Sequence, residues 1–289
     1  MADHTSLLEN LGINIHLHDE IVHSIGDNYS AMITAQELRP SGMAYFDSAV
    51  HESHGARIKE IVDARNAGAK MIGTFCIYVP EEIILAAGAI PVALCGGTGM
   101  SIPHAEKRFP RDICPLIKST LGLAFSKTCP YAPIKDMGVG ETTCDAKKKT
   151  WDILSQSVNF HILEVPQKKT DMSRQLWLEE IRAFAHRVES LTENEITYES
   201  LTDSIRLMNR KRRLLKELNA FRKLPNPPIS GRDALVVMQM ALSDDPVRFC
   251  DKLETLNIEL AERAKNSGAF EDTDSVRVLV AGSPSVMGN

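Results

Sequence analysis

Five of the six cysteines in this chain lie within one stretch of the sequence, and none of them belongs to a C-x-x-C pair. The five are Cys76, Cys95, Cys114, Cys129 and Cys144. Concentrated thiols in an intracellular protein indicate metal binding or redox chemistry. Zinc is the less favoured metal, because structural zinc sites usually take ligands from close cysteine pairs. Core packing is the alternative for any single thiol.

Four of these cysteines stand where a strand or loop is followed by a helix. Cys76 follows an apolar stretch and precedes Pro80, Cys114 and Cys129 are each followed directly by proline, and Cys144 opens a helical pattern. Helix starts expose unpaired N–H groups and the positive end of the helix dipole, which stabilise a thiolate or an anionic cluster. We therefore regard these four as candidate metal ligands.

The two other cysteines are weaker candidates. Cys95 ends an apolar strand pattern, where core packing and ligation are almost equally favoured. Cys250 lies between Phe249 and Asp251 in a helical stretch, which favours core packing.

The overall composition limits the function classes. The chain has 289 residues, of which 43% are hydrophobic, and this is enough for one or two domains. A net charge of -5 argues against a general nucleic-acid or membrane-surface binder. Residues 1–10 show no signal-peptide pattern, and the longest apolar run, 83–95, is short and contains a proline. We expect a cytoplasmic protein without disulfides.

An alternation of strands and helices organises the cysteine-bearing part of the chain. Apolar strand patterns are expected at 70–75, 89–94, 136–139 and 160–165, and helical patterns at 56–68, from 80 onwards, at 112–125 and at 144–156. Strand–helix–strand units pair their strands in parallel. The sequence therefore predicts an α/β fold with a Rossmann-like parallel-sheet domain at 56–166, preceded by an N-terminal extension at 1–55.

The pattern changes after Pro166. Long amphipathic helices are expected at 173–191, 197–222, 229–242 and 245–267, so residues 167–272 are predicted to form a helical subdomain. A last strand pattern at 276–281 predicts that 273–289 opens a second α/β domain. No further strand–helix pattern follows 276–281, so we expect this second domain to be truncated.

Four segments resemble one known family. They are residues 73–92 (GTFCIYVPEEIILAAGAIPV), 109–119 (FPRDICPLIKS), 129–131 (CPY) and 139–149 (VGETTCDAKKK). Together they resemble the 2-hydroxyacyl-CoA dehydratase D-component family, which includes benzoyl-CoA reductase subunits. They are most similar to its double-cubane-cluster reductase branch. The resemblance covers roughly residues 56–284.

This resemblance implies an iron–sulfur cofactor, either a single 4Fe–4S cluster or a double-cubane 8Fe–9S cluster. Cys76 and Cys114 match the pair that the first α/β domain gives to a cubane, and Cys129 and Cys144 match the additional ligands of the double-cubane branch. The resemblance also implies a small-molecule or acyl-CoA substrate and a homo- or heterodimer. Electrons would come from a separate ATP-hydrolysing iron–sulfur activator, in keeping with a sequence that has no P-loop or dinucleotide-binding glycine motif.

The same resemblance leaves alternatives open. Retention of Cys129 and Cys144 favours a reductase over a 2-hydroxyacyl-CoA dehydratase subunit that eliminates water by a radical route. Ser283 stands where relatives often carry cysteine, and Ala146 replaces a usual glycine. With the expected truncation, these departures keep a non-catalytic cluster-binding remnant as a third interpretation.

Two further features near the cysteines are candidates for function. Glu141 precedes Cys144 and is the candidate catalytic proton donor, with a structural role as the alternative. The lysine run 147–149 is a candidate contact for an acyl-CoA phosphate or for an acidic activator. A solvated helix face is the competing interpretation of that run.

Overall fold

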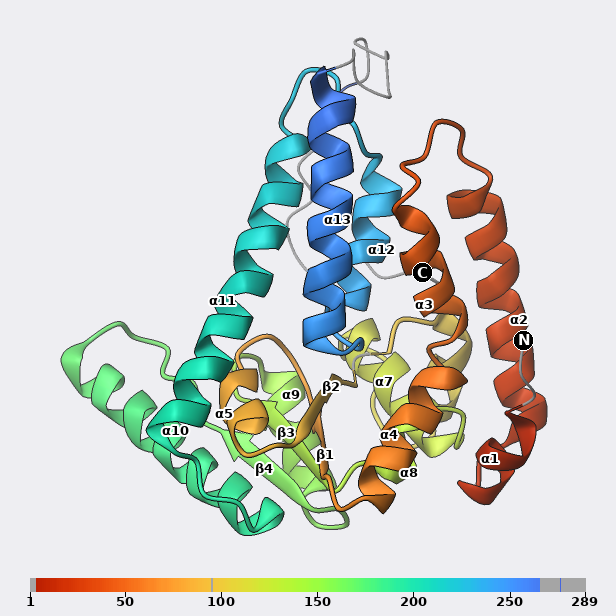
Figure 1. Cartoon of the computed structure of the whole chain (residues 1–289). Coiled ribbons are helices and arrows are strands. Elements are labelled where there is room, and N and C mark those ends of the chain that lie inside the picture. The colour runs from red at the N-terminus through yellow and green to blue at the C-terminus, as the bar shows by residue number, and fades with distance from the viewer. Residues whose placement is uncertain (1–3, 95, 266–275, 277–289) are drawn as a thin grey trace. The chain divides into compact units, whose positions relative to one another are not determined.

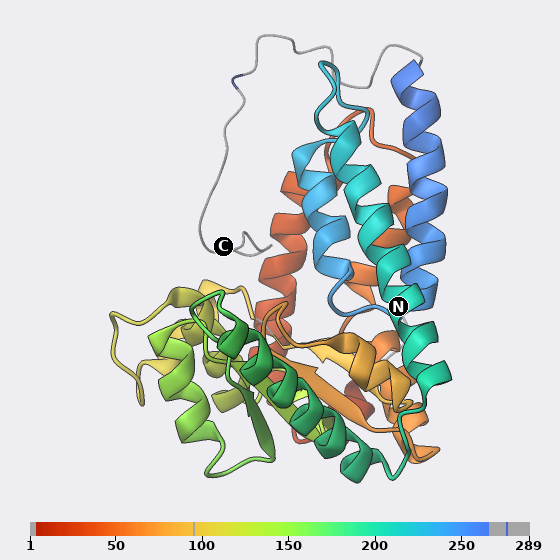
Figure 2. The ribbon, with the colours of Figure 1, turned by 90° about the vertical axis from the view of Figure 1, so that its left-hand side faces the viewer.

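A computed structural model describes residues 4–94, 96–265 and 276, and Figures 1 and 2 show it as a ribbon. The chain forms two compact units, each assembled from two separate stretches. The sheet unit comprises Met1–His18 and Gly55–Arg206, and the helical unit comprises Asp19–His54 and Leu207–Asn289. This division differs from the linear one expected from the sequence. Residues 19–54 join the helical unit, and 167–206 join the sheet unit, because packing rather than chain order groups the helices.

The sheet unit is built on four parallel strands, as the sequence predicts. They are β1 (Met71–Thr74), β2 (Ile90–Ala93), β3 (Met137–Glu141) and β4 (Phe160–Leu163). The strand order is β2-β1-β3-β4, and every neighbouring pair is parallel. The α/β class is therefore confirmed. In a parallel sheet all carboxyl ends lie at one edge, where such folds carry their ligands.

The helices of this unit pack on the two faces of the sheet or on one another. They are α1 (Thr5–Asn10), α4 (Ala56–Asn66), α5 (Glu81–Ala86), the 3-10 helix η2 (Gly99–Ser101), α6 (Ile102–Ala105), α7 (Pro115–Phe125), α8 (Tyr131–Ile134), α9 (Asp145–Leu154) and α10 (Asp171–Thr192). Alternate residues of β1 point to opposite faces. Met71 packs with Ile58 and Ile61 of α4, and Ile72 belongs to the core that includes Phe184 of α10. Figure 2 shows α10 in front of the sheet.

The helical unit has its own core. Its helices are the second part of α2 (Ile15–Tyr29), the π-helix η1 (Ser30–Thr34), α3 (Met43–His51), most of α11 (Tyr198–Phe221), α12 (Gly231–Met240) and α13 (Pro246–Lys265). Phe46 of α3 packs edge-to-face against Phe249 of α13, with ring centroids 6.0 Å apart. Cys250 is fully buried in this core, as expected. Figure 1 shows α11, α12 and α13 side by side.

Expected and observed elements agree closely where both exist. Each of the four expected strands and each of the long helices is present within a few residues of its expected bounds. The short helices η2, α6 and α8 were not expected. The strand expected at 276–281, Cys95 and Ser283 lie outside the described residues, apart from Val276. Among the helices of the described ranges, none is both long and apolar enough to cross a membrane.

Candidate functional site

Three of the four candidate cysteines lie in connections that leave the carboxyl ends of the strands. Cys76 follows β1, Cys114 is the N-cap of α7 on the path from β2, and Cys144 is the N-cap of α9 directly after β3. Cys76 and Cys114 are partly exposed and Cys144 is exposed. Because the strands are parallel, these thiols belong to one edge of the sheet. We call Cys76, Cys114 and Cys144 the edge cysteines.

An aromatic cluster lies beneath this edge and holds its segments. The ring of Phe75, next to Cys76, packs against Trp151 of α9 with centroids 4.7 Å apart, and Trp151 stacks on Phe160 at 5.1 Å. Cys114 packs against the same cluster. The Trp151 indole N–H donates to the carbonyl of Glu141 at 2.9 Å. The cluster thus links β1, β3, α7 and α9 at the positions that carry the thiols.

Two glycines of β3 make room for these rings. A Cβ atom on Gly140 would lie 2.5 Å from the Trp151 ring, and one on Gly138 would lie 2.6 Å from the Phe160 ring. Both distances are shorter than any van der Waals contact allows, and rings in a packed cluster have little freedom to move away. The alternating glycines of the Met137–Glu141 segment therefore allow α9 to approach the sheet. The Gly138-x-Gly140 spacing is the sequence signal of this close approach.

The helix α7, which begins after Cys114, is positioned by a close approach between Gly122 and Ser101. A Cβ on Gly122, in the middle of α7, would lie 2.0 Å from the carbonyl oxygen of Ser101. The buried Ser101 hydroxyl donates to the Ser119 carbonyl at 2.8 Å. The η2 turn therefore packs directly on the α7 backbone. This contact fixes the helix whose first turn begins at Cys114, where Pro115 occupies its preferred first position.

Cys76 has an unusual backbone conformation. Its φ angle is 77°, in the left-handed region that a residue with a side chain rarely adopts. This conformation costs roughly 1–2 kcal/mol relative to the ordinary one. Strained residues of this kind cluster at functional sites, where the surrounding fold over-determines them. The Phe75 N–H, which donates to the Val139 carbonyl at 2.8 Å, anchors the backbone just before the strained residue.

Glu141 ends β3 as a fully buried carboxylate with both oxygens engaged. Oε2 accepts the Thr143 N–H at 2.6 Å, and Oε1 accepts a hydrogen bond from the ammonium of Lys147. Burial alone would raise the pKa of Glu141, but the bonds from Lys147 and Thr143 outweigh it and lower the pKa below its ordinary value. A carboxylate that is held ionised has no proton to donate. This favours a structural role for Glu141 over the role of proton donor.

The lysine run of α9 has three different environments. Lys147 pairs with the buried Glu141, and against the opposing effect of burial the Glu141 carboxylate and the Cys76 sulfur together raise the pKa of Lys147. Lys148 and Lys149 form exposed pairs with Asp145 and Asp152 within the same helix. Lys147 is therefore part of the site, and its partners were missed from the sequence. These groups come together because β1 pairs with β3. The local sequence pattern does not predict that pairing.

Cys129 lies in a different kind of connection. It precedes α8 on the path from a helix into β3, and it packs against the cluster that contains Ile58 and Met71. Burial raises the pKa of the Cys129 thiol, although backbone N–H groups of Tyr131 and Ala132 point to its sulfur and act in the opposite direction. The structure does not place Cys129 with the edge cysteines.

The donor chemistry of the edge fits an iron–sulfur cluster. Its three thiols are free, two of them start helices whose N–H groups and dipoles favour negative charge, and the Lys147 ammonium interacts electrostatically with the third. Within residues 4–94 and 96–265, no three His, Cys, Asp or Glu side chains converge on a point as a single metal ion requires. A cubane bonds each cysteine to a different iron, so its ligands surround it instead of converging.

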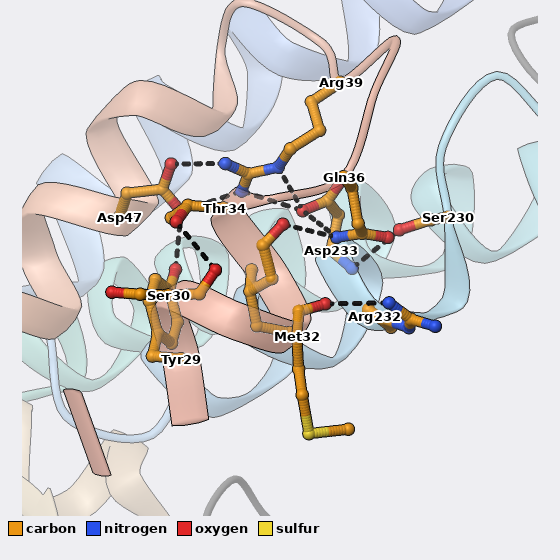
Figure 3. A network of polar contacts seen from close by, with 11 residues as sticks. Tyr29, Ser30, Met32, Thr34, Gln36, Arg39, Asp47, Ser230, Arg232 and Asp233 are labelled. Carbon is orange, nitrogen blue, oxygen red and sulfur yellow. Dashed lines mark hydrogen bonds and ion pairs between the residues drawn. The ribbon is translucent and has the colours of Figure 1, made fainter. Parts of the chain in front are cut away.

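A second polar cluster lies inside the helical unit, and none of its residues is a cysteine. Figure 3 shows the Arg39 guanidinium between the carboxyls of Asp47 and Asp233. The Tyr29 hydroxyl donates to Asp47, and the Ser230 hydroxyl caps the first turn of α12. Burial and the bond to Asp47 raise the pKa of Tyr29, and the bond to Asp47 raises the pKa of Arg39. These groups connect residues 19–54 to α12. Their spacing in the sequence matches no recognisable motif.

The sheet unit is thus an α/β domain that presents thiols at the carboxyl edge of a parallel sheet. The chain belongs to the family described as 2-hydroxyglutaryl-CoA dehydratase, D-component, whose model matches residues 76–289. The match begins at Cys76 and includes every edge cysteine.

Curated relatives agree with this assignment. The chain is 34% identical over 226 residues to the putative dehydratase subunit YjiM of Escherichia coli, covering 78% of this chain and 58% of the relative. It is 26% identical over 178 residues to a benzoyl-CoA reductase subunit of Thauera aromatica, covering 60% and 45% of the two chains. It is 24% identical over 236 residues to the (R)-phenyllactyl-CoA dehydratase beta subunit of Clostridium sporogenes, covering 77% and 62%. The chain therefore spans about half the length of the curated relatives it matches.

Proposed function

We propose that this chain is the iron–sulfur subunit of a 2-hydroxyacyl-CoA dehydratase-like reductase. In this proposal it receives low-potential electrons from a separate ATP-hydrolysing iron–sulfur activator. The observation that carries the proposal is the common edge of Cys76, Cys114 and Cys144 in a family of dehydratases and reductases. Packing alone does not account for the three thiols, since Cys144 is exposed and Cys76 and Cys114 are partly exposed.

The proposed ligands are the four cysteines predicted from the sequence, with unequal support. The positions of Cys76, Cys114 and Cys144 support ligation at the sheet edge. Ligation by Cys129 rests on the family resemblance alone, because its thiol packs against an apolar cluster. When bound, a 4Fe–4S or 8Fe–9S cluster supplies a low-potential electron. The chain's own contribution is to hold the thiolates, and to offset negative charge with the N-termini of α7 and α9.

The proposed substrate is a small molecule or an acyl-CoA. Three relatives are named after reactions of acyl-CoA substrates, and they are subunits of larger enzymes. We therefore propose that the chain works in a homo- or heterodimer. The exposed Ile77 and Tyr78 follow Cys76 directly and give the edge an apolar rim suited to a substrate or a subunit.

A 2-hydroxyacyl-CoA dehydratase subunit is the second candidate. It is favoured by the names of the relatives, since the E. coli, C. sporogenes and Acidaminococcus fermentans proteins are all named as dehydratase subunits. A non-catalytic cluster-binding module is the third. These candidates differ in the number of irons and in turnover, so one preparation tests all of them.

The experiment is anaerobic purification with iron and acid-labile sulfide counts per chain. About eight irons support the double cubane and the reductase, and about four support a single cubane and the dehydratase. Cys114→Ser is expected to lose iron, whereas the matched variant Cys250→Ala, in the helical core, is expected to keep it. Zinc in place of iron, or equal iron in Cys114→Ser and the parent protein, would overturn the proposal.

A further inference from the structure

Three consecutive lysines of α9 differ sharply in environment although their chemistry is the same. The Lys147 side chain is 16% exposed and pairs with Glu141, which is 0% exposed. The Lys148 side chain is 44% exposed and the Lys149 side chain is 72% exposed. An exposed pair contributes little, whereas a buried pair is retained only with good geometry and hydrogen bonds. The burial of Lys147 therefore needs an explanation that the two other lysines do not.

Sheet register brings the partners of Lys147 together. Thr74 of β1 is paired with Val139 of β3. Two residues beyond each member of that pair stand Cys76 and Glu141, so the thiol and the carboxylate leave neighbouring strands at the same level. Lys147, in the first turns of α9, reaches both of them.

Two hydrogen-bond acceptors of the Lys147 ammonium lie close to it. An ammonium has three N–H groups. One donates to Glu141 Oε1 and one to the Thr143 hydroxyl at 3.3 Å, which leaves one N–H for the Cys76 sulfur, with which the ammonium interacts electrostatically. Glu141 is in turn held by the Thr143 N–H at 2.6 Å. The Lys147 ammonium is thus held by a buried carboxylate and interacts electrostatically with the Cys76 thiol.

We propose that Glu141 and Lys147 are a positioning pair that directs an N–H···S hydrogen bond at Cys76 and raises the reduction potential of the cluster this sulfur binds. This inference rests on the proposed function. Hydrogen bonds to the ligand sulfurs and nearby positive charge are established means by which a protein sets cluster potentials, because they stabilise the more negative, reduced state. Glu141 acts through Lys147 and does not contact the substrate in this scheme.

The test is a redox titration of the anaerobically prepared holoprotein and its variants. Lys147→Met is expected to shift the cluster potential to more negative values, and Lys147→Arg is expected to restore much of the shift because it keeps the charge. Lys149→Met removes the same charge from an exposed position of the same helix and is expected to leave the potential unchanged. Equal potentials in Lys147→Met and the parent protein would overturn the inference.

Two additions keep the test decisive. Lys147→Met leaves Glu141 buried without its partner, so the double variant Glu141→Gln/Lys147→Met, which carries neither charge, is measured as well and is expected to show the same negative shift. The alkylation rate of Cys76 in metal-free protein at fixed pH gives a readout without any cluster. It is expected to fall in both Lys147→Met variants and to stay unchanged in Lys149→Met.

These readouts separate the two ideas. If the parent protein takes up no iron while the Cys76 alkylation rate falls in Lys147→Met, the proposed function fails but the contact of the pair with the thiol stands. If iron is bound and neither potential nor alkylation responds to Lys147, the proposed function stands and the positioning pair is wrong.

Discussion

Both units bury charged side chains, but they do so in different ways. In the sheet unit one carboxylate, Glu141, meets one ammonium, Lys147, and each Glu141 oxygen has a hydrogen bond. In the helical unit two carboxyls, Asp47 and Asp233, share the guanidinium of Arg39. Among the described residues, Asp233 Oδ2 is buried without a hydrogen-bond partner.

The difference separates a site from a structural connection. The cation of the sheet unit has a donor left for a thiol, so its charge is available to a ligand. The guanidinium of the helical unit is used entirely within the protein, where it joins residues almost two hundred positions apart in the sequence. The experiments below break or sharpen this contrast, beginning with the largest expected effect.

Removal of the shared guanidinium is expected to destabilise the protein most. Arg39→Met leaves two carboxyls without a cation, one of them fully buried, and loss of one partner from a buried pair costs about 3–5 kcal/mol. Chemical denaturation measures the change. Arg232→Met is the matched control, because Arg232 is an exposed arginine of the same unit that donates to the Met32 carbonyl and, among the described residues, to no carboxylate (Figure 3). If Arg39→Met lowered the free energy of unfolding no more than the control does, Arg39 would not be what connects these segments.

A methyl group on β3 is expected to disturb the sheet unit next most strongly. Gly140→Ala places a Cβ 2.5 Å from the Trp151 ring and forces α9 outward, at a cost of about 1–3 kcal/mol. Tryptophan fluorescence and denaturation together report the change. Gly99→Ala, where nothing lies within 4 Å of the added carbon, is expected to be nearly neutral. Unchanged stability of Gly140→Ala would show that α9 is free to move.

A third charged pair, Arg65 with Asp136 in the sheet unit, is expected to make stability depend on acid pH. Burial alone would raise the pKa of Asp136, but the bonds from Arg65 and from the Met71 N–H lower it below its ordinary value. Asp136 therefore stabilises the fold above pH about 4, and this contribution is lost as the pH falls through the lowered value. Asp136→Asn is expected to cost about 1–3 kcal/mol at neutral pH and to show a shallower loss of stability in acid.

The control for this acid series is Asp152→Asn, which removes an exposed carboxylate that pairs with Lys149. It is expected to follow the pH profile of the parent protein. A steeper acid profile for Asp136→Asn than for the parent would reverse the expected sign.

The smallest effect is expected at Arg210 on the surface of α11. Arg210 pairs with Asp251 and Glu254 of α13, and both carboxylates are exposed. Exposed pairs contribute about 0–1 kcal/mol, and salt screens them. Arg210→Ala should therefore lower the free energy of unfolding by less than about 1 kcal/mol, with a smaller difference at high salt. A loss comparable to that of Arg39→Met would remove the distinction between buried and surface charge.

Local pattern was sufficient to predict the strands and long helices. Strands such as 71–74 and 90–93 are short apolar runs between clear helix signals, and helices such as α10 and α13 have long amphipathic stripes. The placement of the edge cysteines also followed, because a parallel sheet brings the ends of its strands to one edge. These features depend on residues close together in the sequence.

What could not be predicted depends on contacts between distant segments. Residues 19–54 join α12 and α13 through hydrogen bonds such as those from Arg39 to Asp233 and from the Gly42 N–H to Glu259. The periodicity of the sequence does not predict these bonds. The role of Lys147 depends on β1 and β3 being neighbours, a choice of strand order. Cys129 shares the cysteine–proline signal of Cys114, yet it lies on the path into a strand instead of out of one.

The left-handed backbone at Cys76 has a consequence for protein engineering. Glycine adopts that conformation without a steric penalty, so a selection that rewards heat resistance alone should enrich Cys76→Gly. The variants that survive heating best would then be those that had lost a sulfur atom from the sheet edge. Under the proposed function this thiol is an iron ligand, so thermal screening of the chain would need a parallel assay for iron.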